Sequence, residues 1–349
     1  MLNTAKNRNS HKLEAITLAL LGLVFLFQAS CSGALTTTGV ILGEKATNHS
    51  IFRSNDYAVC LLKCKETPSN LADRLLGDAR KSWLIEDANE GVSFEKGQRI
   101  IIPLKDENKG GLTADGYQVV PILVYHRFAE KCESPLCMPV DIFDQQMRYL
   151  KDNGYRVITM DRLLGFLQYR HAIPRKSVVI NIDDGYRSIY NTAYPILKKY
   201  GFRATLFIYT DFVGASKSAI TWDQLREMKS DGFEVASHTL SHCDLTKRRE
   251  GEDAKAHAAR IKKELFVSKE IIDEELEQDT ISIAFPYGYY DERILNICDK
   301  VGYKIGVTVR GGGNPFFSDP LVLRRDQILQ KDIETFIAKL KINHRFFFK

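Results

Sequence analysis

Two adjacent aspartates and two closely spaced histidines have the residue types of a metal-dependent hydrolytic site. Asp183 and Asp184 are consecutive, and His238 and His242 lie four positions apart, a spacing that would put both imidazoles on one side of a helical turn. Two histidines with one carboxylate can bind zinc or another first-row divalent metal and leave a position open for water. Alone, an Asp-Asp-Gly turn is more often a solvated loop and a His pair more often lies on a helix surface. Their combination favours a metal site.

The elements that must position these side chains alternate between strands and helices. Strand-like apolar runs occupy 121–125, 178–182, 204–209, 233–236, 281–285 and 303–309, and helical segments occupy 142–153, 189–200, 222–230, 253–277 and 292–301. Regular alternation predicts an α/β fold with a parallel sheet and right-handed crossovers, which over residues 118–349 would close into a (β/α) barrel. Catalytic groups of such barrels lie at the carboxyl ends of strands. His126, Asp183–Asp184, His238 and Phe285–Gly288 all follow predicted strands.

Residues 118–349 resemble the NodB-homology polysaccharide deacetylases of carbohydrate esterase family four. The sequence Asn-Ile-Asp-Asp-Gly ending at Gly185 is similar to the first motif of that family, the segment from His238 to His242 to the second, and Phe285–Gly288 to the third. The arginine that many members carry just before the third motif is absent. Tyr125-His126 is similar to the start of the domain in a permuted branch that includes poly-GlcNAc deacetylases. The resemblance implies a distorted barrel of the NodB type.

The resemblance also implies roles for the residues of the metal site. Asp184, His238 and His242 would hold a divalent metal, with Zn²⁺ expected and Co²⁺ or Ni²⁺ as alternatives. Asp183 would be the general base that takes a proton from water. His126 would protonate the departing amine, in place of the late histidine that other branches use.

Further positions are implied to assist the reaction. The backbone N–H of Tyr287, which follows Pro286, would donate to the oxyanion. Arg324 or Arg325 would orient Asp183 in place of the missing third-motif arginine, although a surface position explains either arginine equally well.

The N-terminus has the pattern of an export signal over residues 1–31. A basic segment precedes an uncharged apolar run from Ala15 to Phe27, which is short for a membrane span of about 20 residues. A membrane anchor is the alternative. The small residues around Cys31 resemble a bacterial lipobox, which implies a lipidated Cys31, a membrane-anchored lipoprotein and a location in the periplasm or cell envelope. An exported chain can form disulfides, and Cys60/Cys64 and Cys132/Cys137 are the locally plausible pairs.

A small unit is predicted between two linkers, at 32–54 and 106–117. Within residues 55–105, a strand at 57–62, helices at 68–76 and 82–89 and a strand at 99–103 are expected. This order resembles a LysM module, a binder of GlcNAc-containing glycans. The alternative is a folded spacer without a ligand.

Composition narrows the choice of partner. The 349 residues include 49 Lys and Arg against 44 Asp and Glu, a net charge of +5 without a dense basic stripe, which argues against nucleic acid. The leading hypothesis is metal-dependent N-deacetylation of a GlcNAc-containing polysaccharide, either exopolysaccharide or peptidoglycan. The alternatives are a catalytically decayed glycan-binding envelope protein and a deacylase of O-acetyl esters or small amides.

Overall fold

The computed structural model describes residues 50–105, 108–113, 116–329, 331–341 and 344–345. The predicted export signal at 1–31, with Cys31, and most of the first predicted linker lie outside these ranges. Within the described ranges, every helix is too short or too polar to serve as a membrane span.

Residues 50–104 form a three-stranded antiparallel sheet with two helices. The elements are β1 (Ser50–Arg53), β2 (Tyr57–Leu61), α1 (Pro68–Leu76), α2 (Ser82–Ala88) and β3 (Arg99–Pro103), in the sheet order β1-β2-β3. Thr67 caps α1 by accepting a hydrogen bond from the N–H of Asn70, and Leu71 and Ile85 are fully buried. Elements β2, α1, α2 and β3 match the predicted ranges to within a residue, whereas β1 was not predicted and lies in the first predicted linker. The LysM assignment stays a prediction.

An eight-stranded sheet forms the centre of the larger part of the chain. Its main path runs β15-β14-β13-β12-β11-β7-β17, all neighbours are parallel, and β10 pairs with β11. The strands are β7 (Ile122–Tyr125), β10 (Arg156–Val157), β11 (Ser177–Asp184), β12 (Thr205–Ile208), β13 (Glu234–Ser237), β14 (Ser282–Ala284), β15 (Ile305–Val307) and β17 (Asp326–Gln327).

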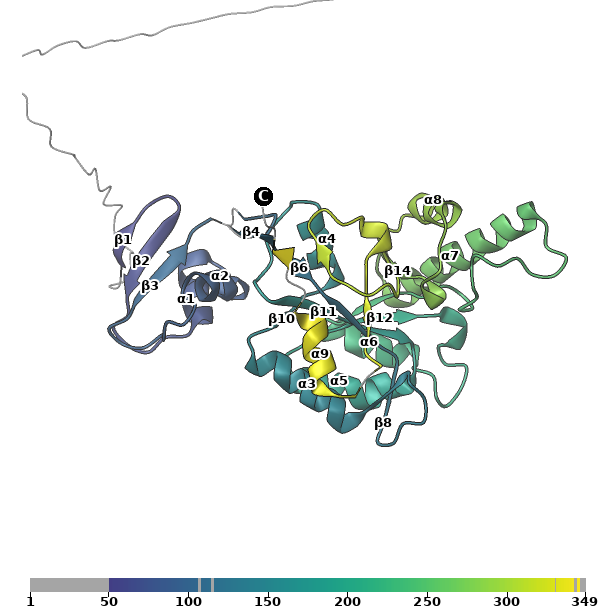
Figure 1. The fold of residues 1–349 in the computed structure, drawn as a ribbon, viewed down its shortest axis with the longest axis horizontal. Helices are drawn as coiled ribbons and strands as arrows, with labels where there is room; N and C mark the ends of the chain where they lie inside the picture. Colours follow the sequence, from purple (N-terminus) through teal and green to yellow (C-terminus); the bar gives the residue numbers. More distant parts are fainter. Residues whose placement is uncertain (1–49, 106–107, 114–115, 330, 342–343, 346–349) are drawn as a thin grey trace, which may run out of the picture. The chain divides into compact units, whose positions relative to one another are not determined.

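The two ends of this sheet approach each other through the segment at 323–328. Leu323 forms a parallel bridge with Val307 of β15, and β17 pairs with β7 a few residues later. The sheet therefore curls into a distorted barrel, which confirms the predicted fold class. Figure 1 shows the curled strands with helices around them.

Helices cover the outside of the sheet. They are α3 (Val140–Asp152), α4 (Met160–Leu167), α5 (Tyr194–Tyr200), α6 (Trp222–Ser230), α7 (Ala254–Leu276), α8 (Glu292–Val301) and α9 (Ile333–Leu340). Helix α3 packs against α5 and α9, and α7 packs against α6, α8 and β13 (Figure 1). Helices α4 and α9 were not predicted.

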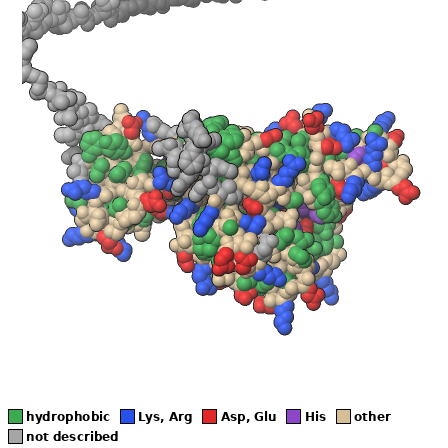
Figure 2. Space-filling model, viewed as in Figure 1, with side chains coloured by type: hydrophobic (Ala, Val, Ile, Leu, Met, Phe, Trp, Pro, Cys, Tyr) green, Lys and Arg blue, Asp and Glu red, His purple; other side chains and the backbone are tan. Residues whose placement is uncertain are grey.

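Three further small sheets of two or three short strands lie outside the central sheet in the described residues. They are β4 (Leu112–Thr113) and β5 (Gly116–Tyr117) with β18 (His344–Arg345), β6 (Val119–Val120) with β16 (Asn314–Pro315), and β8 (Arg127–Ala129) with β9 (Cys137–Pro139). Strands β4 and β5 lie in the predicted second linker. On the face shown in Figure 2, Lys and Arg side chains are interspersed with Asp and Glu side chains.

The alternation of side chains along β11 determines which of them face the barrel interior. Val178, Ile180 and Ile182 pack in the core cluster under the helices, whereas Val179 packs with the inner cluster that includes Phe207 and Leu323. Because successive side chains of a strand point to opposite faces, Asp183 points inward like Val179. It reaches the open end of the barrel interior at the carboxyl end of the strand.

Candidate active site

Most of the predicted site residues come from the carboxyl ends of neighbouring strands. Strand β11 ends with Asp183 and Asp184, and His126 and His238 directly follow β7 and β13. Arg325 directly precedes β17 and so lies at the amino end of that parallel strand, from which its long side chain reaches Asp183. Because the order β13-β12-β11-β7-β17 places these strands side by side, residues that are far apart in sequence converge at the carboxyl edge of the sheet.

Asp184, His238 and His242 form a candidate metal centre, with one ligand atom from each residue within 4.8 Å of the others. The Nε2 atoms of His238 and His242 lie 3.6 and 3.5 Å from Oδ1 of Asp184. Nδ1 of His238 lies 2.8 Å from the carbonyl oxygen of Ala284, a partner that requires the proton on Nδ1 and leaves the Nε2 lone pair available. This donor set, two imidazoles and one carboxylate, fits a first-row divalent cation.

The loop between the two histidines replaces the predicted helical turn. No helix is present between His238 and His242, and Thr239 and His242 have positive φ angles of 71° and 60°. The ring centroids of the two histidines are nevertheless 4.6 Å apart. The two rings are therefore adjacent, as the spacing predicts, but through a loop and not through a helical turn, because a loop with left-handed residues also brings positions four apart together.

Backbone strain is concentrated at this site. Seven non-glycine residues with positive φ are found in the described part of the chain, and Asp184, Thr239, His242 and Tyr287 are four of them. Each such residue costs about 1–2 kcal/mol, and the surrounding packing must offset this cost. These left-handed residues change the direction of the chain at or just after the ends of β11, β13 and β14.

Electrostatics favour a cation between these ligands. Burial and the charge of Asp183 raise the pKa of Asp184 to about 7. Burial lowers the pKa of His238 to about 3 and also lowers that of His242. Neutral imidazoles are the ligating form, and a bound cation would offset the cost of the adjacent carboxylates.

Asp183 is held in a buried two-point ion pair. Nη1 and Nη2 of Arg325 each donate to one carboxylate oxygen of Asp183 over 2.8 Å, and Nε donates to the carbonyl oxygen of Thr308 over 2.8 Å. The side chains are 0% and 2% exposed. Although burial favours protonation, Arg325 and His238 hold the pKa of Asp183 below its usual range. Arg324 is exposed and donates instead to the carbonyl oxygen of Gly311.

His126 lies half-buried beside this pair. Burial lowers the pKa of its imidazole, the negative charge of Asp183 opposes that effect, and the charges of Arg325 and His242 reinforce it. The ring is therefore electrostatically coupled to the carboxylate and to the candidate metal centre.

Tyr287 and Pro286 lie in a short helical turn that follows β14. Tyr287 has a φ of 61°, and its N–H forms no hydrogen bond with the described residues. Its ring is 54% exposed and packs edge-on against His242 at 5.0 Å between centroids. The turn therefore presents an unused backbone donor beside the candidate metal centre.

Two residues of the site were missed by sequence reasoning. Tyr209 follows β12 and its ring centroid lies 5.2 Å from that of His242, and burial and the charge of Asp184 raise its pKa to about 12. Glu264 of α7 accepts hydrogen bonds from the N–H groups of Leu240 and Ser241 and from the Ser241 hydroxyl. The strand-end rule could have found Tyr209. No local signal marks Glu264, which acts across the fold.

Comparisons with known proteins agree with this geometry. Residues 170–306 match the family model described as polysaccharide deacetylase. The chain is 32% identical over 208 residues to the protein YxkH of Bacillus subtilis, itself named as a polysaccharide deacetylase, covering 60% of this chain and 71% of that protein. It is 33% identical over 172 residues to a poly-beta-1,6-N-acetyl-D-glucosamine N-deacetylase of Staphylococcus aureus, covering 48% of this chain and 59% of that protein.

Solved structures with the same fold cover the barrel. A deacetylase of Streptococcus pyogenes, PplD, solved in complex with acetate, superposes with a TM-score of 0.59 at 31% identity, covering 64% of this chain and 99% of that one. IcaB from Ammonifex degensii superposes with a TM-score of 0.57 at 25% identity, covering 64% of this chain and 97% of that one.

Proposed function

This chain belongs to the polysaccharide deacetylase family and is a polysaccharide N-deacetylase, a hydrolase, and we propose that it removes acetyl groups from a GlcNAc-containing polysaccharide. The observation that carries the proposal is the buried Asp183–Arg325 pair beside Asp184, His238 and His242. A base kept ionised next to three metal ligands suits the activation of water for attack on an amide.

The residues of the chain have distinct tasks in this reaction. Asp184, His238 and His242 would hold a divalent cation, which would supply Lewis acid polarisation of water and of the acetyl carbonyl. Asp183 takes the proton from the attacking water, because Arg325 keeps its carboxylate ionised and fixes its orientation.

Two further groups stabilise the tetrahedral intermediate and protonate the leaving amine when it breaks down. The N–H of Tyr287 donates to the oxyanion, since no other described group uses that donor. His126 donates a proton to the nitrogen of the departing glucosamine. Its lowered pKa makes the protonated ring a strong acid but a minority species at neutral pH.

The polymer and its location are part of the proposal. The relatives named poly-beta-1,6-N-acetyl-D-glucosamine N-deacetylases support poly-GlcNAc as the substrate, with peptidoglycan as the second polymer to test. We further propose Zn²⁺ as the metal, an exported protein anchored in the envelope through a lipid on Cys31, and glycan binding by the LysM-like unit at 55–105.

An acetate-release assay tests the proposal. Purified protein is supplied with Zn²⁺, Co²⁺ or Ni²⁺ and offered poly-β-1,6-GlcNAc, chito-oligosaccharides, peptidoglycan and an O-acetylated glycan. Release from an N-acetylated polymer supports the proposal, and release from the O-acetylated glycan alone assigns esterase activity instead. Failure to release acetate from every polymer with every metal rejects it.

Two substitutions separate metal binding from proton transfer. Asp183→Asn should retain the metal and lose turnover, whereas His238→Ala should lose both. Metal content, measured by atomic emission after dialysis, distinguishes the two variants independently of activity.

A further inference from the structure

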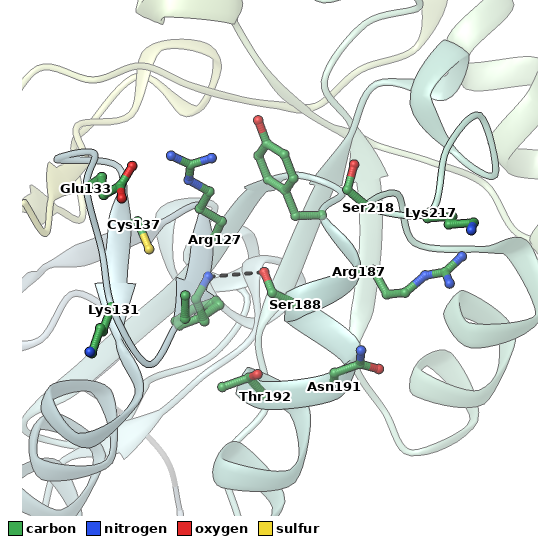
Figure 3. Close-up of a pocket in the computed structure, with 13 residues that line it drawn as sticks. Arg127, Lys131, Glu133, Cys137, Arg187, Ser188, Asn191, Thr192, Lys217 and Ser218 are labelled. Atoms are coloured by element: carbon green, nitrogen blue, oxygen red, sulfur yellow. Dashed lines mark hydrogen bonds between the residues drawn. The ribbon is translucent and has the colours of Figure 1, made fainter.

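A pocket with a volume of about 560 Å³ opens beside the candidate metal centre. Its walls come from the segment at 127–137, from residues 186–192 and from Lys217–Ser218. Figure 3 shows Arg127 in the middle of the group, Lys131 on one side, and Arg187 and Lys217 extending together on the other. The volume is that of a typical small-ligand site.

The lining of this pocket is strongly cationic. Arg127, Lys131, Arg187 and Lys217 carry four positive charges, and Glu133 is the only acidic lining residue. No carboxylate of the described residues forms an ion pair with any of the four cations. Like charges gathered around a cavity repel one another, and a bound anion would offset that repulsion.

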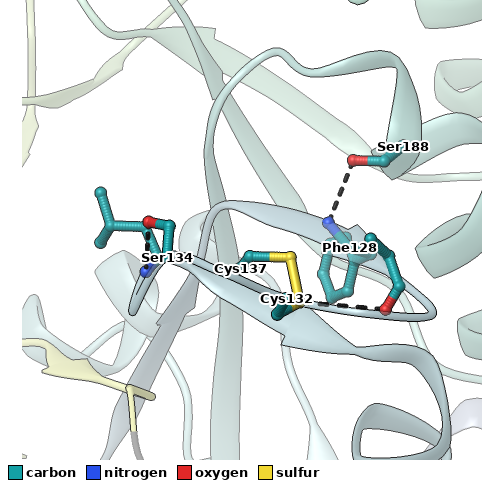
Figure 4. Close-up of a disulfide and its surroundings, with 7 residues drawn as sticks. Phe128, Cys132, Ser134, Cys137 and Ser188 are labelled. Atoms are coloured by element: carbon teal, nitrogen blue, oxygen red, sulfur yellow. Dashed lines mark hydrogen bonds between the residues drawn. A yellow bond between two sulfur atoms is a disulfide. The ribbon is translucent and has the colours of Figure 1, made fainter.

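Two bonds that do not involve these charges hold the walls in place, and Nε of Arg187 also donates to the carbonyl oxygen of Ala219 over 3.0 Å. Cys132 and Cys137 form a disulfide that closes the loop carrying Glu133, and Lys131 directly precedes this loop (Figure 4). The hydroxyl of Ser188 accepts a hydrogen bond from the N–H of Phe128 over 3.1 Å and so joins two of the walls (Figures 3 and 4). The pocket is therefore preformed rather than a gap between loose loops.

The pocket adjoins the candidate metal centre through both of its walls. Arg127 directly follows His126, and Tyr186 lies two residues after Asp184. A sugar whose acetamido group lies at the metal centre would place its neighbour in the chain toward this pocket.

We propose that the cationic pocket binds an oxyanion, either a carboxylate or a phosphate, carried by the polymer next to the acetamido sugar that is deacetylated. The proposal rests on the proposed function and narrows its substrate class to glycans with an acidic group near the scissile acetamide. Guanidinium groups suit both oxyanions, because they donate two parallel hydrogen bonds. The +5 net charge of the whole chain does not predict this local charge.

Matched oligosaccharides test the proposal through acetate release. The neutral probe is a GlcNAc tetramer, the carboxylate probe is a peptidoglycan tetrasaccharide with lactyl groups, and the phosphate probe is a GlcNAc oligomer with a glycerol phosphodiester. We expect kcat/KM to be about tenfold higher for at least one acidic probe than for the neutral one. This preference should shrink between low salt and 0.3 M salt, because the lysines are exposed.

Charge-neutralising variants locate the effect. The double variant Lys131→Gln/Lys217→Gln removes two exposed charges. The triple variant, which adds Arg187→Gln, should abolish the preference for acidic probes and change kcat/KM for the neutral probe less than about twofold. Lys255→Gln/Lys263→Gln on α7 removes two charges, as the double variant does, but away from the pocket, and it should preserve the preference.

Binding measured by calorimetry keeps this test separate from catalysis. The wild-type protein should bind an acidic probe about tenfold more tightly than the neutral probe, and the triple variant should bind them equally. Equal wild-type affinity for all three probes, or a preference that survives the triple variant, overturns the pocket assignment even if acetate is released. Absence of acetate release with preferential binding of an acidic probe would instead reject the proposed reaction alone.

Discussion

Replacement of Arg325 by methionine should remove both the stability and the base that the buried ion pair provides. Arg325 is fully buried and makes three hydrogen bonds of 2.8 Å, two to Asp183 and one to the carbonyl oxygen of Thr308. Methionine fills much of the volume and leaves Asp183 buried without a partner. Breaking one side of a buried pair costs about 3–5 kcal/mol, a large part of the total stability of a domain.

The same substitution should change the protonation of Asp183. Burial is the largest influence on its pKa and raises it, whereas Arg325 is the largest influence that lowers it. Without the guanidinium the pKa of Asp183 rises, and the carboxyl group is protonated over more of the neutral range. We expect kcat to fall about 10²-fold or more, with the acid limb of the activity profile moved to higher pH.

Urea unfolding and kinetics at several pH values measure these effects, with Arg324→Met as the matched control. Arg324 is exposed, so its replacement should change the unfolding free energy by less than about 0.5 kcal/mol. Because the folded pKa of Asp183 lies below its unfolded value of about 3.9, the contribution of the pair is present above that pH and disappears as the pH falls below it. Equal stability and equal pH profiles of the two variants would refute this account of Asp183.

Three further outcomes follow from the site. Glu264→Ala should weaken metal binding about 10–100-fold in a chelator competition, because the loop that carries His242 loses its hydrogen-bond acceptor. Glu264→Gln should have an intermediate effect, and an unchanged metal affinity would contradict this role. Metal affinity should fall as the pH drops below 7, since a proton then competes for Asp184, and a pH-independent affinity between 5 and 7 would count against its being a ligand. Cys132→Ser/Cys137→Ser should lower the unfolding free energy by about 2 kcal/mol, and an unaltered urea midpoint would show that the loop needs no cross-link.

The sequence predicted the strands of the barrel where burial produces long apolar runs. Strand β11 is buried along seven of its eight residues, and the predicted run lies inside it. Strand β17 was not predicted, because only two residues pair there. Its neighbourhood nevertheless contained a usable signal. Leu323 packs in the inner cluster, and side chains two apart on an extended segment face the same way, so alternation favours Arg325 over Arg324 as the inward residue.

Features that depend on distant parts of the chain could not be predicted. The cationic pocket combines residues near 130, 187 and 217. Glu264, in the middle of the long helix α7, accepts hydrogen bonds from the loop at Leu240 and Ser241. Neither arrangement leaves a local pattern, because each requires the barrel to be closed first. The four-residue spacing of the histidines is compatible with either a helix or a loop, which is why the predicted turn was wrong.

The position of Arg325 affects the order in which the enzyme can become active during synthesis. Asp183 and its partner are 142 residues apart, and the partner precedes the strand that closes the barrel against β7. A ribosome that has released the chain only as far as residue 310 has already delivered every candidate metal ligand, but not the counter-ion of the base. The metal ligands and the counter-ion of the base are therefore synthesised at different times. A chain cut ahead of β17 would keep the candidate metal ligands in its sequence but lose the counter-ion of the base, so the activity depends on the strand that closes the barrel.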